Sequence, residues 1–261
     1  MPAKQNIDCK LRGLADKYET TDFIKGDPSW FMHQIDGAEN KELIAFIASS
    51  LSYGSRKQFM KKIQLLLDDI RSFANREQIC SKEIVSQWLV RREFENIIPH
   101  SAESFYRLYS YDTYNQFLEA LASMIEQYGS IKKFLLVEQN IQQEETIHAI
   151  DAIESITRWF RKNGSKGVIP QDTRSSCKRV CMFLRWMVRS NSPVDIGIWS
   201  DIIDRKTLII PMDTHVIQEA KRMNLITSTA TSMSNAVRLS ARLAEVFPDD
   251  PMRGDFALFG L

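Results

Sequence analysis

Residues 175–189 read Ser-Ser-Cys-Lys-Arg-Val-Cys-Met-Phe-Leu-Arg-Trp-Met-Val-Arg. At 100° per residue, Val180, Leu184 and Met187 fall on one side of a helix. Four basic side chains fall within about 60° of one another by the same periodicity: Arg174, Lys178, Arg185 and Arg189. The stretch therefore predicts an amphipathic helix with a basic stripe. The stripe is either a solvated surface or a face turned toward phosphate groups, with Lys178 in its first turn.

Outward from this stretch, the rest of the chain also favours helices. Ten glycines and eight prolines among 261 residues leave few turn signals. A hydrophobic content of 44% is enough for a sizeable core. Apolar residues at helical spacing predict helices over 41–51, 56–73, 82–90, 103–109, 112–128, 131–137, 144–161, 213–224, 233–247 and 254–261. Residues 207–211 could form a short strand, but no partner strand is evident. We expect an all-α fold.

Charge and cysteine content narrow the class of protein. Lysine and arginine number 34 against 33 aspartates and glutamates, so the net charge is +1. That balance argues against coating nucleic acid by bulk charge, although a local basic patch stays possible. No apolar run is long enough for a membrane span, and the first residues lack the apolar core of a signal peptide. Four scattered cysteines suggest a reducing compartment, and we expect a cytoplasmic protein.

A second unusual stretch, residues 209–217, reads Ile-Ile-Pro-Met-Asp-Thr-His-Val-Ile. An aspartate before an apolar helix is most often an N-cap, because its carboxylate accepts the free amides of the first turn. Asp213 has this position and either caps the helix only or also carries chemistry. His215 is more simply a packed or hydrogen-bonded histidine.

Taken together, these stretches resemble the helix-hairpin-helix DNA glycosylases, the group of endonuclease III and 8-oxoguanine glycosylase. Residues 211–216, Pro-Met-Asp-Thr-His-Val, are similar to that superfamily's aspartate motif. Residues 43–56 resemble its early helix, and residues 255–260 its last core helix. The chain resembles more closely still an uncharacterised bacterial family with the motifs CKRxxxFLRWMVR, IPxDTHV and DFALFG. That closer resemblance spans most of the chain and implies no established activity.

The chain also departs from the better-known glycosylases. Arg174 and Ser176 stand where endonuclease III has hairpin glycines. Lys178 and Asp213 are 213 − 178 = 35 residues apart, a spacing similar to that of the archaeal 8-oxoguanine glycosylase branch. No cysteine follows Cys181, so the four-cysteine iron–sulfur loop is absent. We therefore expect no cofactor and no metal ion.

The resemblance implies roles for particular residues. Lys178 corresponds to the lysine that attacks the sugar, and Asp213 to the aspartate that stabilises positive charge on it. Tyr53 or Leu51, in the turn after the early helix, would fill the gap left by an extruded base. Other candidates for contact with DNA are Arg174, Ser176, Arg185, Arg189 and Arg56, each of which could instead serve only solubility.

The resemblance also implies a domain arrangement and a partner. Residues 36–192 would form a central helical lobe, and residues 1–35 with 193–261 a second one, with a cleft between them holding Lys178 and Asp213. The implied function is base-excision repair: a glycosylase and AP lyase acting on a damaged base in duplex DNA. The sequence leaves the oligomeric state open, with a monomer as the simpler expectation.

Two alternatives stay open at this point. The chain could have the glycosylase fold without catalysis, as a helical DNA-binding or structural protein. It could also be a protein-interaction domain with no affinity for DNA, which its near-neutral charge allows. Cys177 and Cys181, four residues apart on a helix, could hold a metal ion, but buried structural cysteines explain the spacing more simply.

Overall fold

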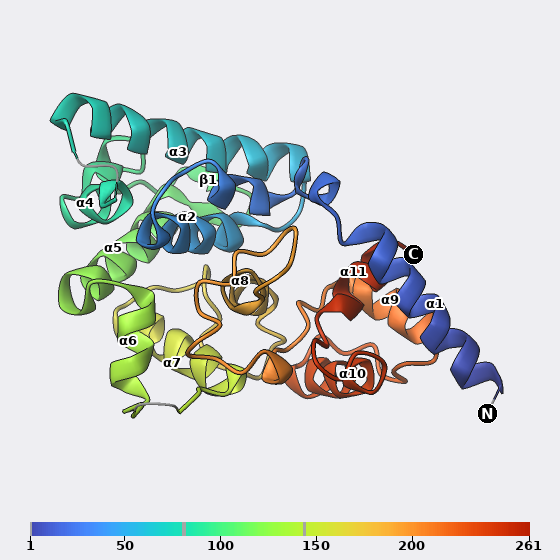
Figure 1. The fold of residues 1–261 in the computed structure, drawn as a ribbon. Helices are drawn as coiled ribbons and strands as arrows, with labels where there is room; N and C mark the ends of the chain where they lie inside the picture. The colour runs from blue at the N-terminus through green and yellow to red at the C-terminus, as the bar shows by residue number, and fades with distance from the viewer. Residues whose placement is uncertain (1, 80–81, 143–144) are drawn as a thin grey trace. The chain divides into compact units, whose positions relative to one another are not determined.

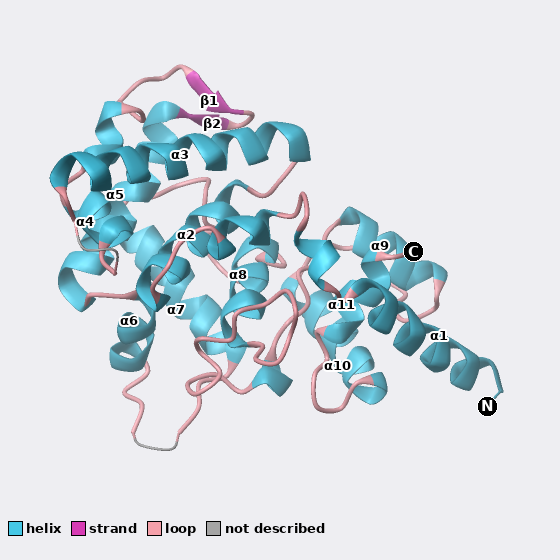
Figure 2. Ribbon diagram, turned by 45° about the horizontal axis from the view of Figure 1, so that its top comes forward, coloured by secondary structure: helices cyan, strands magenta, loops and turns pink. Residues whose placement is uncertain are grey.

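A computed structural model describes residues 2–79, 82–142 and 145–261. The fold is mostly helical, with one small two-stranded sheet among these residues (Figures 1 and 2). The expected all-α class is therefore confirmed at this coarse level. In the described part of the chain, no helix combines the length and the hydropathy that a membrane span requires.

The chain divides into two compact units. Unit 1 comprises Met1–Lys25, Glu144–Ile153 and Thr173–Leu261, and unit 2 comprises Gly26–Gln143 and Glu154–Asp172. These boundaries differ from the expected lobes of 36–192 and 1–35 with 193–261. Residues 173–192 fall in unit 1 because arginines of this segment pair with carboxylates near the end of the chain.

Unit 2 contains most of the first half of the chain. Its elements, in order, are η2 (Pro28–His33), α2 (Ala38–Leu51), α3 (Arg56–Glu77), α4 (Ile84–Val90), η3 (Glu93–Asn96), β1 (Ser104–Tyr106), β2 (Tyr109–Ser110), α5 (Tyr111–Tyr128), α6 (Ile131–Glu138) and the part of α7 (Ala149–Lys162) from residue 154. Most of these helices were predicted from apolar periodicity. Helix α5 is capped by Ser110, whose hydroxyl accepts the amide of Thr113.

Aromatic rings form the centre of unit 2. Phe46 of α2, Phe117 of α5 and Phe160 of α7 pack with ring centroids 5.3–5.8 Å apart. Tyr114 is fully buried beside them, and its hydroxyl lies 3.0 Å from the Ser50 hydroxyl. Burial raises the pKa of Tyr114, so it stays neutral and serves as a hydrogen-bonding core residue.

A buried carboxylate joins two helices of unit 2. Glu42 lies on α2, and its two carboxylate oxygens accept the backbone amides of Ile131 and Lys132 at 2.8 and 3.1 Å. These amides belong to the first turn of α6, where the free N–H groups and the helix dipole favour a negative charge. Glu42 thus fixes the start of α6 against α2.

Glu42→Ala is expected to lower the free energy of unfolding by about 3 kcal/mol, because it removes the carboxylate that accepts two first-turn amides, one of them buried. Urea unfolding followed by circular dichroism measures this loss. Glu39→Ala is the matched control, since Glu39 is exposed on the same helix, and it should change stability by less than about 0.5 kcal/mol. Equal losses in the two variants would contradict the capping role.

The expected helix over 103–109 is wrong, because these residues form the hairpin β1–β2. Phe105, Tyr106 and Tyr109 are buried aromatic residues of the kind that favours a pleated strand. Tyr106 and Tyr109 pair across a two-residue turn, and Arg107 in that turn has a positive φ of 53°. Over so few residues, the spacing of the aromatic side chains also fits one face of a helix. The two-residue turn between β1 and β2 is incompatible with a continuous helix.

Unit 1 contains the rest of the helices. They are α1 (Pro2–Tyr18), η1 (Thr21–Ile24), the start of α7, α8 (Lys178–Val188), η4 (Arg205–Thr207), α9 (Thr214–Arg222), α10 (Met233–Val246) and α11 (Arg253–Phe259). Helix α1 packs along α11, as Figure 1 shows. Residues 208–211 form no strand: the amide of Ile210 donates to the Ser240 hydroxyl instead of to a neighbouring strand.

Candidate active site at the starts of helices α8 and α9

The loop before α8 is held by the segment that precedes α10. Ser175 forms an antiparallel bridge with Ser232, and the Ser176 amide donates to the Thr231 carbonyl oxygen at 3.1 Å. Cys177 then adopts a left-handed backbone, with φ at 45°, which residues other than glycine seldom do. This conformation turns the chain into α8, so Lys178 becomes the first residue of the helix.

The start of α9 is fixed by the side chain of Asp213. Its Oδ1 accepts the amide of Val216 at 3.0 Å, as expected for an N-cap. The loop before α8 also contacts this region, because the Ser176 hydroxyl donates to the Met212 carbonyl oxygen at 3.2 Å. The two helix starts are therefore neighbours within unit 1.

Lys178 and Asp213 form an ion pair across these two helix starts. The distance from Lys178 Nζ to Asp213 Oδ2 is 3.1 Å, and the side chains are 31% and 39% exposed. Burial on its own raises the pKa of the Asp213 carboxyl, but the charge of Lys178 and the Val216 amide outweigh it, so the pKa is lowered. Asp213 is thus a carboxylate at neutral pH, with one oxygen on the helix amide and the other on the lysine.

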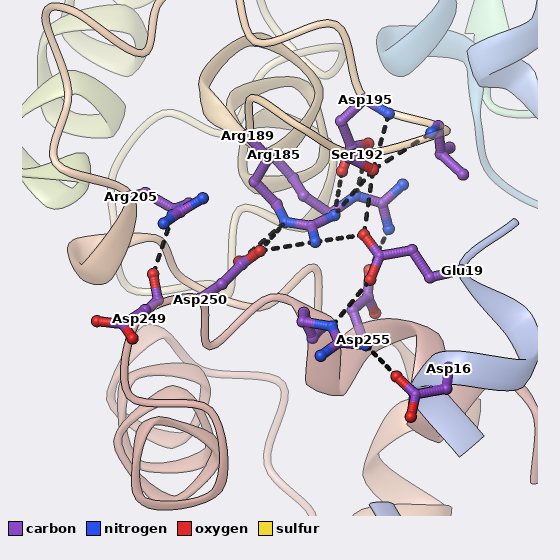
Figure 3. Close-up of polar contacts among 12 residues, drawn as sticks. Asp16, Glu19, Arg185, Arg189, Ser192, Asp195, Arg205, Asp249, Asp250 and Asp255 are labelled. Atoms are coloured by element: carbon purple, nitrogen blue, oxygen red, sulfur yellow. Dashed lines mark hydrogen bonds and ion pairs between the residues drawn. The ribbon is translucent and has the colours of Figure 1, made fainter. Parts of the chain in front are cut away.

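The basic stripe expected on α8 is not a continuous solvent-exposed face. Arg185 and Arg189 lie on the same side of the helix as Lys178, but both are buried and paired with carboxylates (Figure 3). Arg185 binds Asp255 and lies 3.3 Å from Asp195. The expectation that Arg185 and Arg189 contact DNA phosphates is therefore wrong, because their guanidinium groups already bind carboxylates inside unit 1.

Arg189 is the centre of this network. Its side chain is 1% exposed, and it binds Asp195, Asp250 at 2.8 Å and Glu19 at 2.5 Å. Asp250 precedes α11 but does not cap it, since α11 has Met252 at its N-cap and Asp250 binds Arg189. These contacts join the end of α8 to the segments next to α1 and α11, which are far apart from it in the sequence.

Two further predicted contacts with DNA do not fit the structure. Ser176 is buried and its hydroxyl is used by Met212, so it offers nothing to a phosphate. Leu51 is fully buried in unit 2 and cannot enter a duplex. Both residue types are suited to contact with DNA, but packing buries each of these side chains.

The remaining predicted residues lie on accessible parts of the two units. Arg174 is exposed in the loop before α8, in the same unit as Lys178. Tyr53 is partly buried in the turn between α2 and α3 of unit 2, and Arg56 is exposed at the start of α3. The candidate site in unit 1 thus consists of Lys178 and Asp213, with Arg174 nearby in sequence.

The two cysteines at the start of α8, Cys177 before the helix and Cys181 within it, have a structural environment. Cys177 and Cys181 are both buried, and the Cys181 thiol donates to the Ser176 carbonyl oxygen. Burial raises the pKa of Cys181, which disfavours the thiolate that binds metals. Among the residues that the structure describes, no cluster of three or more His, Cys, Asp or Glu side chains could hold a metal ion.

Sequence reasoning missed the partners of the buried arginines. Asp195 and Asp255 were not singled out, although both are buried and complete the network. Asp255 also lies close enough to Lys178 and Asp213 for their charges to affect its pKa, which burial raises. The only available signal was an aspartate within an otherwise apolar last helix, at residue 255.

Comparisons with known proteins place the chain in a family without assigning it an activity. No curated protein and no solved structure matches the chain. Residues 27–261 match the family described as protein of unknown function (DUF2400). The match includes α8, α9 and the Lys178–Asp213 pair, and it spans most of the sequence. The chain therefore belongs to the DUF2400 family.

Proposed function

We propose that the chain is a DNA glycosylase with AP lyase activity, acting on a damaged base in duplex DNA. The observation that carries this proposal is the Lys178–Asp213 pair, an amine and a carboxylate 3.1 Å apart at two helix starts. The resemblance to helix-hairpin-helix glycosylases supports the same two roles. The base itself is not identified by these residues.

The exposure of the pair separates it from the structural ion pairs of α8. Along one side of the helix, the side-chain exposure is 1% for Arg189, 6% for Arg185 and 31% for Lys178. A purely structural pair gains little from a position in solvent, since exposed ion pairs contribute only about 0–1 kcal/mol. Lys178 and Asp213 are open to a substrate, whereas the two arginines are not.

In the glycosylase step, the bond between the base and C1′ breaks and the base leaves with the electron pair. Positive charge develops on the sugar, and the Asp213 carboxylate stabilises it. Lys178 is charged in its ion pair with Asp213, so it first releases a proton to water, and the departing base takes up a proton from water. The neutral Lys178 amine then forms the new bond to C1′, and Asp213 accepts the proton that the bonded nitrogen loses. The target base must first leave the helical stack, which costs a few kcal/mol.

In the lyase step, the amine bound to C1′ becomes a Schiff base as the sugar ring opens. Water then takes a proton from C2′, and the electron pair of that C–H bond forms the C2′–C3′ double bond as the 3′ phosphate leaves, so the DNA strand is cut. Hydrolysis releases Lys178. Each of these steps uses only the amine, the carboxylate and water.

The test is covalent trapping on a duplex with a single abasic site, in the presence of sodium borohydride. Borohydride reduces the Schiff base, and the product migrates as a protein–DNA adduct. We expect the wild-type chain to form this adduct on the abasic duplex and not on an intact one. Wild-type trapping no greater than that of Lys178→Gln would overturn the lyase assignment. DNA binding without trapping would favour a binding protein instead.

A further inference from the structure

Helix α10 of unit 1 has an apolar stripe with a groove beside it. At 100° per residue, Val237, Ala241 and Ala244 lie within about 60° of one another on the helix. Val237 is 44% exposed, and Ala241 is exposed as well. The groove next to the stripe is mostly apolar and has a volume of about 410 Å³. Exposed apolar surface of this kind is typical of a contact made with a partner.

The groove lies between α10 and two other segments of unit 1. Its walls are the residues around the start of α7, the segment 206–209 and the stripe itself. Hydrogen bonds hold the second wall along α10. The Arg205 side chain donates to the Asp249 carbonyl oxygen just beyond the helix end, and the Ile210 amide donates to the Ser240 hydroxyl near its middle. The groove is therefore a fixed feature that runs along the second half of the helix.

The polar groups of the groove are mostly in use. The Ser240 hydroxyl bonds to backbone groups both as donor and as acceptor, and so does the Thr207 hydroxyl. Lys206 Nζ lies 3.2 Å from the Asp249 carboxylate, so these two charges cancel. His148 lines the groove and is exposed. Few groups are left to orient a small polar ligand, whereas an apolar side chain fits such a lining.

The charges of α10 indicate which partner fits. The helix contains three charged residues, Arg238, Arg242 and Glu245. Arg242 pairs with Asp8 of α1 at 2.6 Å, and Glu245 lies 3.4 Å from Arg242 while staying 54% exposed. Arg238 is exposed, and it lies within about 20° of Glu245 around the helix. One edge of the stripe thus carries a cation and, two turns later, an anion.

This pattern is complementary to itself when two copies of α10 run antiparallel. A twofold axis between residues 241 and 242 places residue 238 of one copy opposite residue 245 of the other, since both positions are equally far from the axis. The same edge of the stripe meets in both copies, so each Arg238 faces the second copy's Glu245. Val237 then faces the second copy's groove near Ala244.

We propose that the chain forms a weak homodimer, in which the α10 stripes of two copies pack antiparallel and Val237 of each copy enters the groove of the other. Two pairs between Arg238 and Glu245 flank the contact and set its direction. The occupant is a second copy because one helix supplies the projection, the groove and both charges. A partner of another kind would not require a cation and an anion placed symmetrically about the stripe.

The contact is small, which sets its expected strength. Helix α10 has 14 residues and is about 21 Å long. A single helix pair of this length buries an area at the low end of specific interfaces, so we expect a dissociation constant on the order of tens of micromolar. At a few micromolar the chain is then mostly monomeric, and the contact adds little to unfolding measurements. The dimer stands whether or not Lys178 and Asp213 are catalytic.

Charge reversal tests the contact in sedimentation equilibrium of the full chain, over roughly 1 to 300 μM. The wild-type mass should rise from that of one chain toward that of two. Arg238→Glu and Glu245→Arg should each weaken the dimer at least roughly tenfold, because each puts two like-charged pairs across the contact. An equimolar mixture of the two variants should recover dimers, since one then carries two glutamates along this edge and the other two arginines. Lys221→Glu, at an exposed position of α9, is the control and should dimerise as wild type.

An apolar substitution tests the groove separately. Val237→Ala should weaken the dimer roughly tenfold, because the twofold axis makes the loss of buried apolar surface count twice. Val137→Ala removes the same atoms from a valine that is 64% exposed on α6 of unit 2, and it should dimerise as wild type. Equal dimerisation by the two variants would overturn the place given to Val237.

The remaining outcomes also decide the proposal. A wild-type chain that stays monomeric at the highest concentration overturns the dimer and leaves the groove to a different protein. Dimers that neither charge reversal weakens have their interface on another surface. If each reversal weakens the dimer but the mixture does not recover it, the antiparallel pairing of Arg238 with Glu245 is wrong.

Discussion

Lys178→Gln is expected to reduce the borohydride-trapped adduct to background, a loss of at least roughly 10³-fold. Glutamine keeps much of the side-chain length and can still bond to Asp213, but its amide nitrogen is not a nucleophile. Without an amine at this position no Schiff base forms, so there is nothing for borohydride to reduce. The measurement is the single-turnover rate of adduct formation on the abasic duplex.

The unfolding free energy of Lys178→Gln shows whether a loss of trapping reflects lost chemistry or a misfolded variant. Lys178 and Asp213 form a partly exposed pair, so its loss should cost no more than about 1 kcal/mol of unfolding free energy. Lys221→Gln, on the exposed side of α9, is the matched control and should trap as wild type. Residual trapping in Lys178→Gln close to wild type would mean that another amine reacts.

Asp213→Asn separates the charge of the residue from its capping role. Asparagine is as good an N-cap as aspartate, so it can keep the hydrogen bond from the Val216 amide. The variant should therefore fold normally yet react roughly 10²–10³-fold more slowly, because the carboxylate no longer stabilises positive charge or accepts the proton. A normal rate in Asp213→Asn would reduce Asp213 to a helix cap.

Arg189→Met is expected to cost about 3–5 kcal/mol of unfolding free energy, the largest stability effect among these variants. The substitution removes the guanidinium that pairs with Glu19, Asp195 and Asp250 and leaves their charges buried without it. A loss of this size is a large part of the roughly 5–15 kcal/mol that typically stabilises a domain. Urea unfolding at neutral pH measures it.

Two further variants test the reason for that loss. Arg238→Met, an exposed arginine of α10 in the same unit, should change stability by less than about 0.5 kcal/mol. Adding Asp195→Asn to Arg189→Met should recover part of the loss, because one uncompensated charge disappears. If Arg189→Met and Arg238→Met have similar stabilities, the network contributes little and another feature holds α8 in place.

The sequence was a good guide to the helices. Apolar periodicity predicted α2, α3, α5, α9 and α10 within a few residues, and the cap of α9 by Asp213 is confirmed. These features depend on neighbours three or four residues apart, which a linear pattern records directly. The short pattern over 103–109 was misleading, since residues 104–110 form a hairpin. The long pattern over 144–161 was right about the helix but not about its start, since α7 begins at Ala149.

The sequence by itself determined the helical class, and its resemblance to the glycosylases singled out Lys178 and Asp213 as a candidate pair. Only the tertiary structure decided which basic residues of α8 are accessible. Arg185 and Arg189 share a side with Lys178, yet their partners Asp255 and Asp250 lie 70 and 61 residues away along the chain. Periodicity shows which side chains share a face, but burial of a charge depends on distant carboxylates that only the folded chain brings to it.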